Sequence, residues 1–247
     1  MVTIAVYNFK GGVGKTTSAV NLAYLASEDD RTLLWDLDPQ GSASYFCKAN
    51  ANKKGGAKTI MGGKKNISDF IQETDFVELD VLPADFSIRH MDIVLDETKK
   101  SKKRLKSITD QFAKYYSYTF IDCPPGLSLL SEHIFHTADY LLVPVIPTTL
   151  SLRTYYQVLE YFKENDLDVT SIIPFFSMAD VRKKMHKDLM ESTFNTDSAL
   201  LKSYIKNASD IERMGTEQAP LPSFAPKSKS SLSYTALWED IKKKIQS

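Results

Sequence analysis

One octapeptide near the start of the chain holds residue types that bind phosphate. It consists of Lys10, Gly11, Gly12, Val13, Gly14, Lys15, Thr16 and Thr17. Glycines let a backbone turn tightly and direct its N–H groups at phosphate oxygens. A strand-like segment precedes the octapeptide and a helix-like one follows it, so a helix N-terminus adds its amides and positive dipole end to the same site. The sequence therefore predicts a phosphate-binding loop, in which Lys15 reaches the β- and γ-phosphates of a nucleotide and the Thr16 hydroxyl binds Mg²⁺.

The loop departs from the general G-x-x-x-x-G-K-[ST] pattern at its first position. Phe9 stands where that pattern has a glycine, and an additional lysine, Lys10, follows it. A cation beside the γ-phosphate can neutralise the charge that develops there during phosphoryl transfer. Lys10 is therefore a candidate catalytic residue. The alternative is an exposed lysine beside a turn, which the strand–loop–helix context disfavours.

Three aspartates follow two other apolar segments of the chain. Asp36 and Asp38 come after the apolar residues 32–35, and Asp122 comes after residues 118–121. Side chains alternate along an extended chain, so Asp36 and Asp38 are expected to point to one side. Carboxylates at strand ends supply Mg²⁺ ligands and orient water in phosphoryl transfer. Taken singly, Asp38 could equally be a helix N-cap and Asp122 part of a buried turn, but both are predicted at the edge of the sheet where ligands bind.

These three motifs, in this order, resemble those of the ParA/MinD family of ATPases. K-G-G-x-G-K-T at 10–16 resembles the family's deviant phosphate loop, D-x-D-P-Q-G at 36–41 resembles a ParA segment, and D-C-P-P-G at 122–126 resembles its Walker B strand and switch loop. The resemblance runs nearly end to end. It is closer to ParA than to MinD because Pro-Gln-Gly follows the second aspartate, and the loop begins at residue 10 with no helix-turn-helix extension ahead of it.

The resemblance implies a slow, Mg²⁺-dependent ATPase with ATP and Mg²⁺ as cofactors. It implies that Lys10 crosses an ATP-dependent homodimer interface to the partner's phosphates, acting with Lys15, and that Asp38 orients the attacking water. Thr16, Asp36 and Asp122 are the implied metal residues, with Asp122 acting through water, and residues 10–17 contact the nucleotide.

The region expected near adenine departs from the family. Lys206 and Asn207 stand where many relatives have a proline close to the base. Ser177 or Met178, just past an apolar run, could also border the adenine. The sequence leaves open which of them does.

The remaining pattern predicts the elements that must position these residues. Predicted strands span residues 2–7, 32–35, 76–82, 118–121, 140–145, 169–176 and 200–205. Predicted helices span residues 16–27, 102–115, 131–137, 152–164, 181–194 and 231–245. Near-continuous apolar runs are typical of strands covered on both faces. The alternation predicts an α/β fold, a doubly wound, mostly parallel sheet flanked by helices as in P-loop NTPases, forming a single domain over residues 1–247.

Composition excludes several classes of protein. The 247 residues are 43% hydrophobic and 25% charged, so a globular domain can bury its core without disulfide or metal. Only two cysteines occur, Cys47 and Cys123, and their spacing fits no metal site, which favours a cytoplasmic setting. No signal-peptide pattern and no apolar stretch of about 18 residues is present, so no membrane span is expected.

Basic residues suggest a partner, although acids and bases balance at 31 each. Lysine-rich runs at 48–66 and 99–106 are predicted to be solvated surface. The family resemblance implies non-specific DNA binding by the ATP dimer, a nucleoid location, and a cargo-bound ParB-like or adaptor activator. The candidate DNA contacts in the C-terminal half are Arg182, Lys183, Lys184, Lys187, Lys202, Lys206, Arg213, Lys227 and Lys229.

Several alternative functions are also compatible with parts of the sequence. Residues 238–247 could form a MinD-like amphipathic membrane helix, although the same apolar positions suit a helix that closes the core. A tyrosine kinase or a metal-cluster carrier on this fold is disfavoured, because the tail has only Tyr234 and no C-x-x-C pair occurs. A nucleotide-switched scaffold without turnover is the non-enzymatic alternative.

Overall fold

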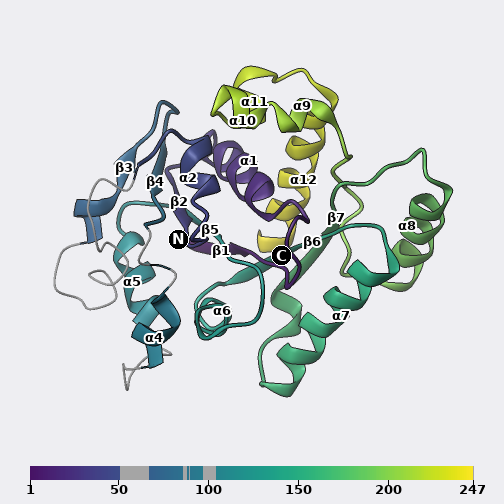
Figure 1. Cartoon of the computed structure of the whole chain (residues 1–247), viewed down its shortest axis with the longest axis horizontal. Helices are drawn as coiled ribbons and strands as arrows, with labels where there is room; N and C mark the ends of the chain where they lie inside the picture. Colours follow the sequence, from purple (N-terminus) through teal and green to yellow (C-terminus); the bar gives the residue numbers. More distant parts are fainter. Residues whose placement is uncertain (51–66, 86–87, 89, 97–103, 247) are drawn as a thin grey trace.

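A seven-stranded sheet runs through the centre of the computed structural model, which describes residues 1–50, 67–85, 88, 90–96 and 104–246 (Figure 1). Its strands are β1 (Val2–Val6), β2 (Thr32–Asp36), β3 (Gln72–Glu73), β4 (Leu79–Leu82), β5 (Tyr118–Asp122), β6 (Tyr140–Val145) and β7 (Ile172–Phe176). The order is β3-β4-β2-β5-β1-β6-β7, and every pair is parallel except β3–β4. This confirms the predicted doubly wound, mostly parallel α/β fold.

Helices cover both faces of the sheet, as Figure 1 shows. One face packs against α1 (Lys15–Ser27), α2 (Ser42–Phe46), α9 (Ser209–Glu212), α10 (Met214–Glu217), α11 (Leu221–Phe224) and α12 (Lys229–Gln246). The other packs against α4 (Met91–Asp96), α5 (Arg104–Phe112), α6 (Leu129–Phe135), α7 (Thr149–Glu164) and α8 (Lys184–Thr196). Short 3-10 turns at Ile67–Phe70 and Val169–Ser171 complete the described elements.

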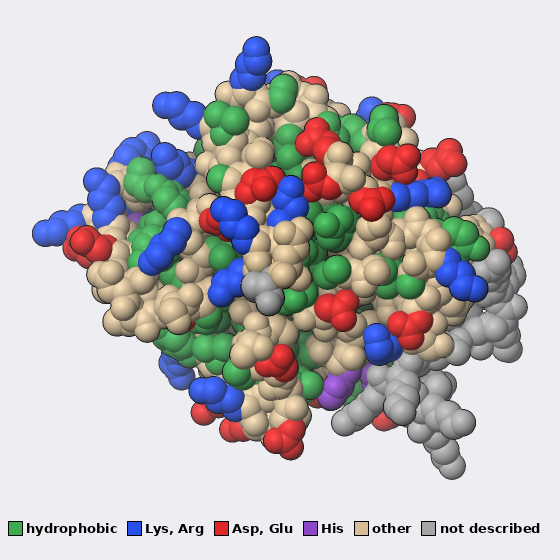
Figure 2. Space-filling model, turned by 180° about the vertical axis from the view of Figure 1, so that it is seen from behind, with side chains coloured by type: hydrophobic (Ala, Val, Ile, Leu, Met, Phe, Trp, Pro, Cys, Tyr) green, Lys and Arg blue, Asp and Glu red, His purple; other side chains and the backbone are tan. Residues whose placement is uncertain are grey.

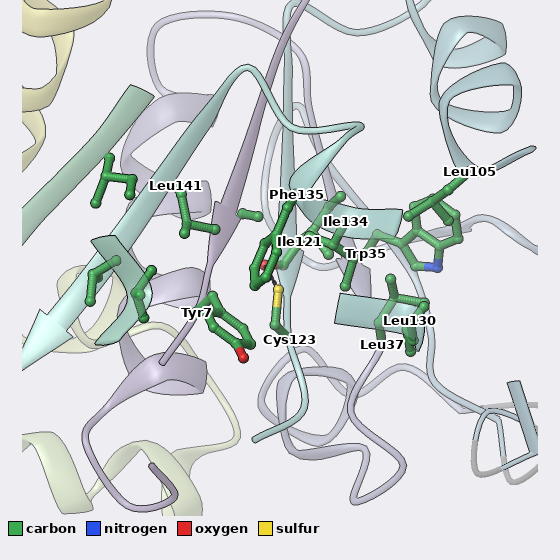
Figure 3. Close-up of a cluster of buried hydrophobic side chains, with 14 of the residues drawn as sticks. Tyr7, Trp35, Leu37, Leu105, Ile121, Cys123, Leu130, Ile134, Phe135 and Leu141 are labelled. Carbon is green, nitrogen blue, oxygen red and sulfur yellow. Dashed lines mark hydrogen bonds between the residues drawn. The ribbon is translucent and has the colours of Figure 1, made fainter. Parts of the chain in front are cut away.

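The strands form because nearly every residue in them is apolar and both faces are buried. Along β1, Ile4 and Val6 join the core under α1 and α12, whereas Ala5 and the following Tyr7 join the core under α6 and α7. Figure 3 shows the second core, in which Tyr7 lies next to the ring of Phe135. The sheet is therefore fixed from both sides, and the loops at its carboxyl edge are held on a rigid support.

Three predicted strands differ from the structure. The strand predicted at 169–176 begins only at Ile172, because Val169–Ser171 forms a 3-10 turn. The strand predicted at 76–82 begins only at Leu79, because Glu78 has φ 58 and Val77 is 83% exposed. Residues 200–205 form no strand. The Leu201 N–H donates to the Pro174 carbonyl and the Ile205 N–H donates to the Phe176 carbonyl. The two donors are four residues apart and the two acceptors only two, so no regular strand pairing forms.

The helices follow the predicted pattern with shifted ends. Helix α8 starts at Lys184 instead of 181, because Asp180 binds the backbone N–H and guanidinium of Arg182 and holds a turn there. The short elements β3, α2 and α4 were not predicted, since few residues carry too little periodicity. Most of the lysine-rich runs 48–66 and 99–106 lies outside the described residues.

Candidate nucleotide-binding site

The register of the sheet brings the phosphate loop and the aspartates together. Asp122 at the end of β5 is aligned with Val6 of β1 on one side and with Asp36 of β2 on the other. The backbone N–H of Leu37 donates to the Asp122 carbonyl at 3.0 Å. The three strand ends therefore open side by side at the carboxyl edge, where open α/β sheets bind ligands.

The glycines of the loop take backbone conformations that other residues avoid. Gly12 has φ 70 and Gly14 has φ 89, both in the left-handed region. Gly14 is also the N-cap of α1 and makes no side-chain cap, so the first amides of α1 are left for an anion. A Cβ on Gly14 would lie 2.8 Å from the Ser177 Oγ. The loop thus has the backbone of a phosphate cradle.

Asn8 holds the start of the loop, a role that the sequence analysis missed. It is fully buried, its Nδ2 donates to the Pro144 carbonyl on β6 at 2.9 Å, and its Oδ1 accepts the Lys10 N–H at 2.9 Å. One side chain thereby ties the loop to a neighbouring strand. Its position as a polar residue between an apolar strand and a glycine-rich loop could have indicated this role from the sequence.

The two lysines of the loop are placed differently. The Lys15 side chain is buried and its Nζ donates to the Lys10 carbonyl at 3.0 Å, so it lies over the loop. Burial lowers the pKa of Lys15, and the nearby Asp122 acts in the opposite direction. The Lys10 residue is exposed. The Lys15 side chain is thus held over its own loop, whereas Lys10 is exposed to solvent.

Asp122 is a buried carboxylate with no hydrogen-bond donor. It is 0% exposed, and neither carboxylate oxygen has a partner among the described residues. Burial, and then the charge of Asp36, raise the pKa of Asp122 well above its usual range, while Thr16 and Lys15 act in the opposite direction. An unpaired buried carboxylate is unfavourable unless a cation joins it. The residues therefore fit Mg²⁺ beside the phosphate loop.

The described residues contain no group of three or more His, Cys, Asp or Glu side chains that could hold a metal by themselves. Cys47 and Cys123 are both buried, in opposite cores of the sheet.

Asp36 is occupied by protein donors. Its carboxylate accepts the Asp38 N–H at 3.1 Å, the Ser44 N–H at 2.8 Å and the Ser44 hydroxyl at 2.7 Å. Burial raises the pKa of Asp36 to about 6, although the bonds from Ser44 act to lower it. Both carboxylate oxygens therefore already accept protein hydrogen bonds, and the expected place of Asp36 in the metal shell stays a prediction. These hydrogen bonds make Asp36 the anchor of the Asp38 segment and of α2.

Asp38 keeps a partly exposed carboxylate at the mouth of the site. One oxygen accepts the Gln40 N–H at 2.9 Å. Its backbone is held by Asp36 and its position follows directly from the end of β2. The arrangement leaves Asp38 accessible to a water or a ligand.

Replacing Asp122 by asparagine tests the burial argument. The pKa of Asp122 is raised in the folded state, so stability is lost as pH rises from the ordinary carboxyl pKa to the raised value, where the buried group becomes charged. The Asp122→Asn variant is therefore expected to be more stable than wild type without metal, by about 1–3 kcal/mol at neutral pH, with the difference shrinking in acid. Chemical denaturation over a pH series measures this. The same variant should lose the extra stability that Mg²⁺·ATP confers on wild type, whereas equal or lower metal-free stability would contradict the burial argument.

A cavity of about 230 Å³ adjoins the phosphate loop. It brings together the residues that the sequence placed near adenine, Ser177, Met178, Lys206 and Asn207, with Gly14 and Thr17 of the loop. The other lining residues are Phe46, Ile205, Ala208, Ile211, Glu212, Gly215 and Tyr234. The cavity is therefore continuous with the phosphate loop through Gly14 and Thr17.

The basic residues separate into groups. Arg182, Lys183, Lys184 and Lys187 are all exposed at the start of α8, and Figure 2 shows Lys and Arg side chains gathered on the side that carries this helix. Lys206 instead lines the cavity. Among the others, Arg213 pairs with Glu217 and stacks on Phe224, and Lys202 donates to the Phe194 carbonyl.

The chain is similar in sequence to known proteins. Residues 1–173 match the AAA domain family AAA_31. The chain is 39% identical over 144 residues to the sporulation initiation inhibitor protein Soj of Bacillus subtilis, a match that covers 58% of this chain and 57% of Soj. Over 246 residues, 97% of the chain, it is 27% identical to the chromosome-partitioning ATPase Soj of Treponema pallidum, covering 96% of that protein.

Solved structures share the fold. A putative plasmid partition protein from Borrelia burgdorferi, bound to AMPPNP, superposes with a TM-score of 0.85 at 23% identity, covering 98% of this chain and 99% of its own. The ATP complex of a McdA variant from Cyanothece superposes with a TM-score of 0.84 at 19% identity. The match covers 100% of this chain and 96% of the McdA chain. The MinD of Pyrococcus horikoshii with Mg-ADP superposes with a TM-score of 0.77 at 20% identity. The match covers 97% of this chain and 95% of the MinD chain. By this family match the chain belongs to the AAA domain family AAA_31, and it is similar in sequence to ParA/Soj proteins.

Proposed function

We propose that this chain hydrolyses ATP with Mg²⁺, dimerises when ATP is bound, and positions or segregates a cargo on non-specifically bound DNA. The observation that carries the proposal is that Asp122 is buried without a hydrogen-bond partner near Lys15, whereas Lys10 of the same phosphate loop is exposed. Asp122 suits a cation that arrives with the nucleotide. Lys10 is left free for a second copy of the chain. Its Soj relatives are named for chromosome partitioning and sporulation control.

The chemistry follows from the residues around the loop. The amides of residues 10–17 and the start of α1 bind the phosphates, and Lys15 releases the Lys10 carbonyl to reach them. Thr16 and Asp122 would hold Mg²⁺, which when bound offsets the charge of the phosphate oxygens. Asp38 accepts a hydrogen bond from the attacking water and orients it. Lys10 adds a positive charge at the partner's γ-phosphate.

DNA binding would use the exposed start of α8. Lys184 and Lys187 lie in the first turn of α8, Lys183 is its N-cap and Arg182 directly precedes it, and a dimer presents two such surfaces at once. Two linked surfaces bind one duplex far more tightly than either does alone, so ATP gains control of DNA affinity through dimerisation. A cargo-bound activator of the ParB or adaptor kind would stimulate hydrolysis and release the protein from the nucleoid.

The Lys10→Ala variant tests the link between ATP and DNA. With wild type, ATP is expected to tighten binding to a labelled random duplex at least about tenfold relative to ADP, because two basic surfaces act together. Lys10→Ala should remove that gain while leaving ATP binding intact. Fluorescence anisotropy over a salt series measures both. ATP-independent DNA binding by wild type would contradict the proposal.

A double variant that removes two positive charges tests whether the start of α8 is the DNA-binding surface. Lys184→Ala with Lys187→Ala should weaken DNA binding and lower the salt dependence by about 0.9 per lost phosphate contact. The matched control removes Lys114 and Lys163, which are also exposed but lie near the ends of α5 and α7. Equal losses from both pairs would assign binding to general charge instead of α8.

The membrane alternative receives no support from the last helix. Leu237 and Ile241 of α12 are fully buried in the core under β1 and β5, and Ile245 packs against the same core. No helix among the described residues is long and apolar enough to cross a bilayer. ATP-dependent sedimentation with anionic liposomes would reverse this assignment.

A further inference from the structure

Tyr7 lies between β1 and the phosphate loop and reaches a distant segment. Its fully buried ring makes edge-to-face contacts with Phe9 and Phe135, at 5.5 Å and 4.7 Å between centroids. Figure 3 shows its hydroxyl directed away from Phe135. That hydroxyl donates to the Gly126 carbonyl at 2.9 Å, across 119 residues of sequence. A buried tyrosine thus binds the loop that follows Asp122.

The same glycine is held a second time. The Gly126 N–H donates to the Phe9 carbonyl at 3.0 Å, so both of its backbone polar groups bond to residues just ahead of Lys10. Gly126 has φ 86, and a Cβ there would meet no atom within 4 Å. Glycine is therefore required by the backbone conformation and not by lack of space. We call these two hydrogen bonds of Gly126, to Tyr7 and to Phe9, the Gly126 latch.

The Tyr7 hydroxyl also lies beside the start of α6. Ser131 donates to the Ser128 carbonyl at 2.8 Å and accepts the Ser128 N–H at 2.7 Å, closing the N-terminus of that helix. Burial raises the pKa of Tyr7 above its usual range, and the Ser131 hydroxyl acts in the opposite direction. Tyr7 is thus a neutral donor that joins β1, the loop at 124–128 and α6.

We propose that Tyr7 is a positioning residue for ATP hydrolysis, whose hydroxyl holds residues 124–128 against the start of the phosphate loop and so keeps Asp122 in place. This inference rests on the proposed ATPase function. Only Cys123, Pro124 and Pro125 separate Asp122 from Gly126, and the two prolines have fixed φ, so a shift at Gly126 is passed to Asp122. Displacements below about 1 Å matter for a reacting group.

The kinetic test is Tyr7→Phe, which keeps the ring and removes only the hydroxyl. The basal kcat is expected to fall about fivefold, equivalent to about 1 kcal/mol, with the KM for ATP changed less than about twofold. Tyr155→Phe is the matched control. Tyr155 is equally buried in the same core, and its hydroxyl donates to Asp197 at 3.0 Å, away from the loop. It should lower stability without changing kcat.

Hydrogen exchange tests the latch without activity. Pro124 and Pro125 carry no N–H, so Gly126 has the first exchangeable amide after Cys123 and a short peptide reports it. Tyr7→Phe should speed exchange there at least about tenfold, whereas Tyr155→Phe should leave it unchanged. Gly126→Ala should lower kcat by itself, and combining it with Tyr7→Phe should cost little more, because both break one latch.

The outcomes separate the two proposals. Slower turnover with faster Gly126 exchange, specific to Tyr7→Phe, supports the positioning role. Unchanged exchange, or faster exchange with unchanged kcat, overturns it while leaving the ATPase proposal standing. If wild type hydrolyses no ATP under any condition, the proposed function and the role of Tyr7 in turnover both fail, and exchange still shows whether Tyr7 holds the loop.

Discussion

Replacing Gly14 by alanine is expected to lower ATP affinity at least about 100-fold, a loss near 2.7 kcal/mol. Gly14 has φ 89, and an added Cβ would lie 2.8 Å from the Ser177 Oγ. The backbone must then leave its left-handed conformation, or strain of about 1–3 kcal/mol stays in the fold. In the first case the amides at the start of α1 turn away from the phosphates. Isothermal titration with ATP and Mg²⁺ measures the affinity.

The control for folding is Gly11→Ala. Gly11 is exposed, has no positive φ, and an added Cβ meets no atom within 4 Å. The melting temperature of Gly11→Ala should match that of wild type, whereas the melting temperature of Gly14→Ala should be several degrees lower. If Gly14→Ala bound ATP as tightly as wild type, the loop could not be the phosphate site. A variant Ser177→Ala should relieve part of the clash but not the backbone strain.

Replacing Asp38 by alanine is expected to slow ATP hydrolysis by about 10²- to 10³-fold while leaving ATP affinity within about threefold. Asp38 is the partly exposed carboxylate at the mouth of the site, and its backbone is already held by Asp36. Removing its side chain takes away the group that orients water without disturbing the phosphate cradle. Single-turnover hydrolysis and equilibrium binding of ATP separate the two effects.

Ser44→Ala is the companion variant for the segment around Asp38. Its hydroxyl bonds Asp36 and accepts the Ala84 N–H at 2.9 Å, so its loss should loosen Asp38 and slow hydrolysis less than Asp38→Ala does. Hydrolysis by Asp38→Ala within threefold of wild type would rule out the assigned role. It would then favour a scaffold that binds ATP without depending on this carboxylate.

Local sequence was sufficient for the central features of this protein. The phosphate loop is contiguous, so the types and order of residues 10–17 predict its chemistry without any tertiary information. The strands of the core are buried on both faces and read as apolar runs, which predicts a parallel sheet. Because such strands end at one edge, the position of Asp122 could be inferred from its place after a strand.

Tertiary structure decided what each side chain does within that frame. The family resemblance implies a metal role for Asp36. In the structure its Oδ2 accepts two hydrogen bonds from Ser44, eight residues away on α2, and its Oδ1 accepts the Asp38 N–H. Where donors fall around a carboxylate depends on the turn into a short helix, which has too few residues to leave a periodic signal. The same holds for the strand predicted at 200–205, where hydrogen bonding to β7 and not residue type set the outcome.

The contacts that hold the loop together are the least visible in sequence. Asn8 bonds Pro144 across 136 residues and Tyr7 bonds Gly126 across 119. Such pairs form because the register of β1 against β5 and β6 brings their strand ends together, and a register is a property of the whole sheet. The sequence by itself therefore determined the class of chemistry and the sheet that carries it. Folding alone decided which buried groups are paired and which, like the Asp122 carboxylate, have no hydrogen-bond partner among the described residues.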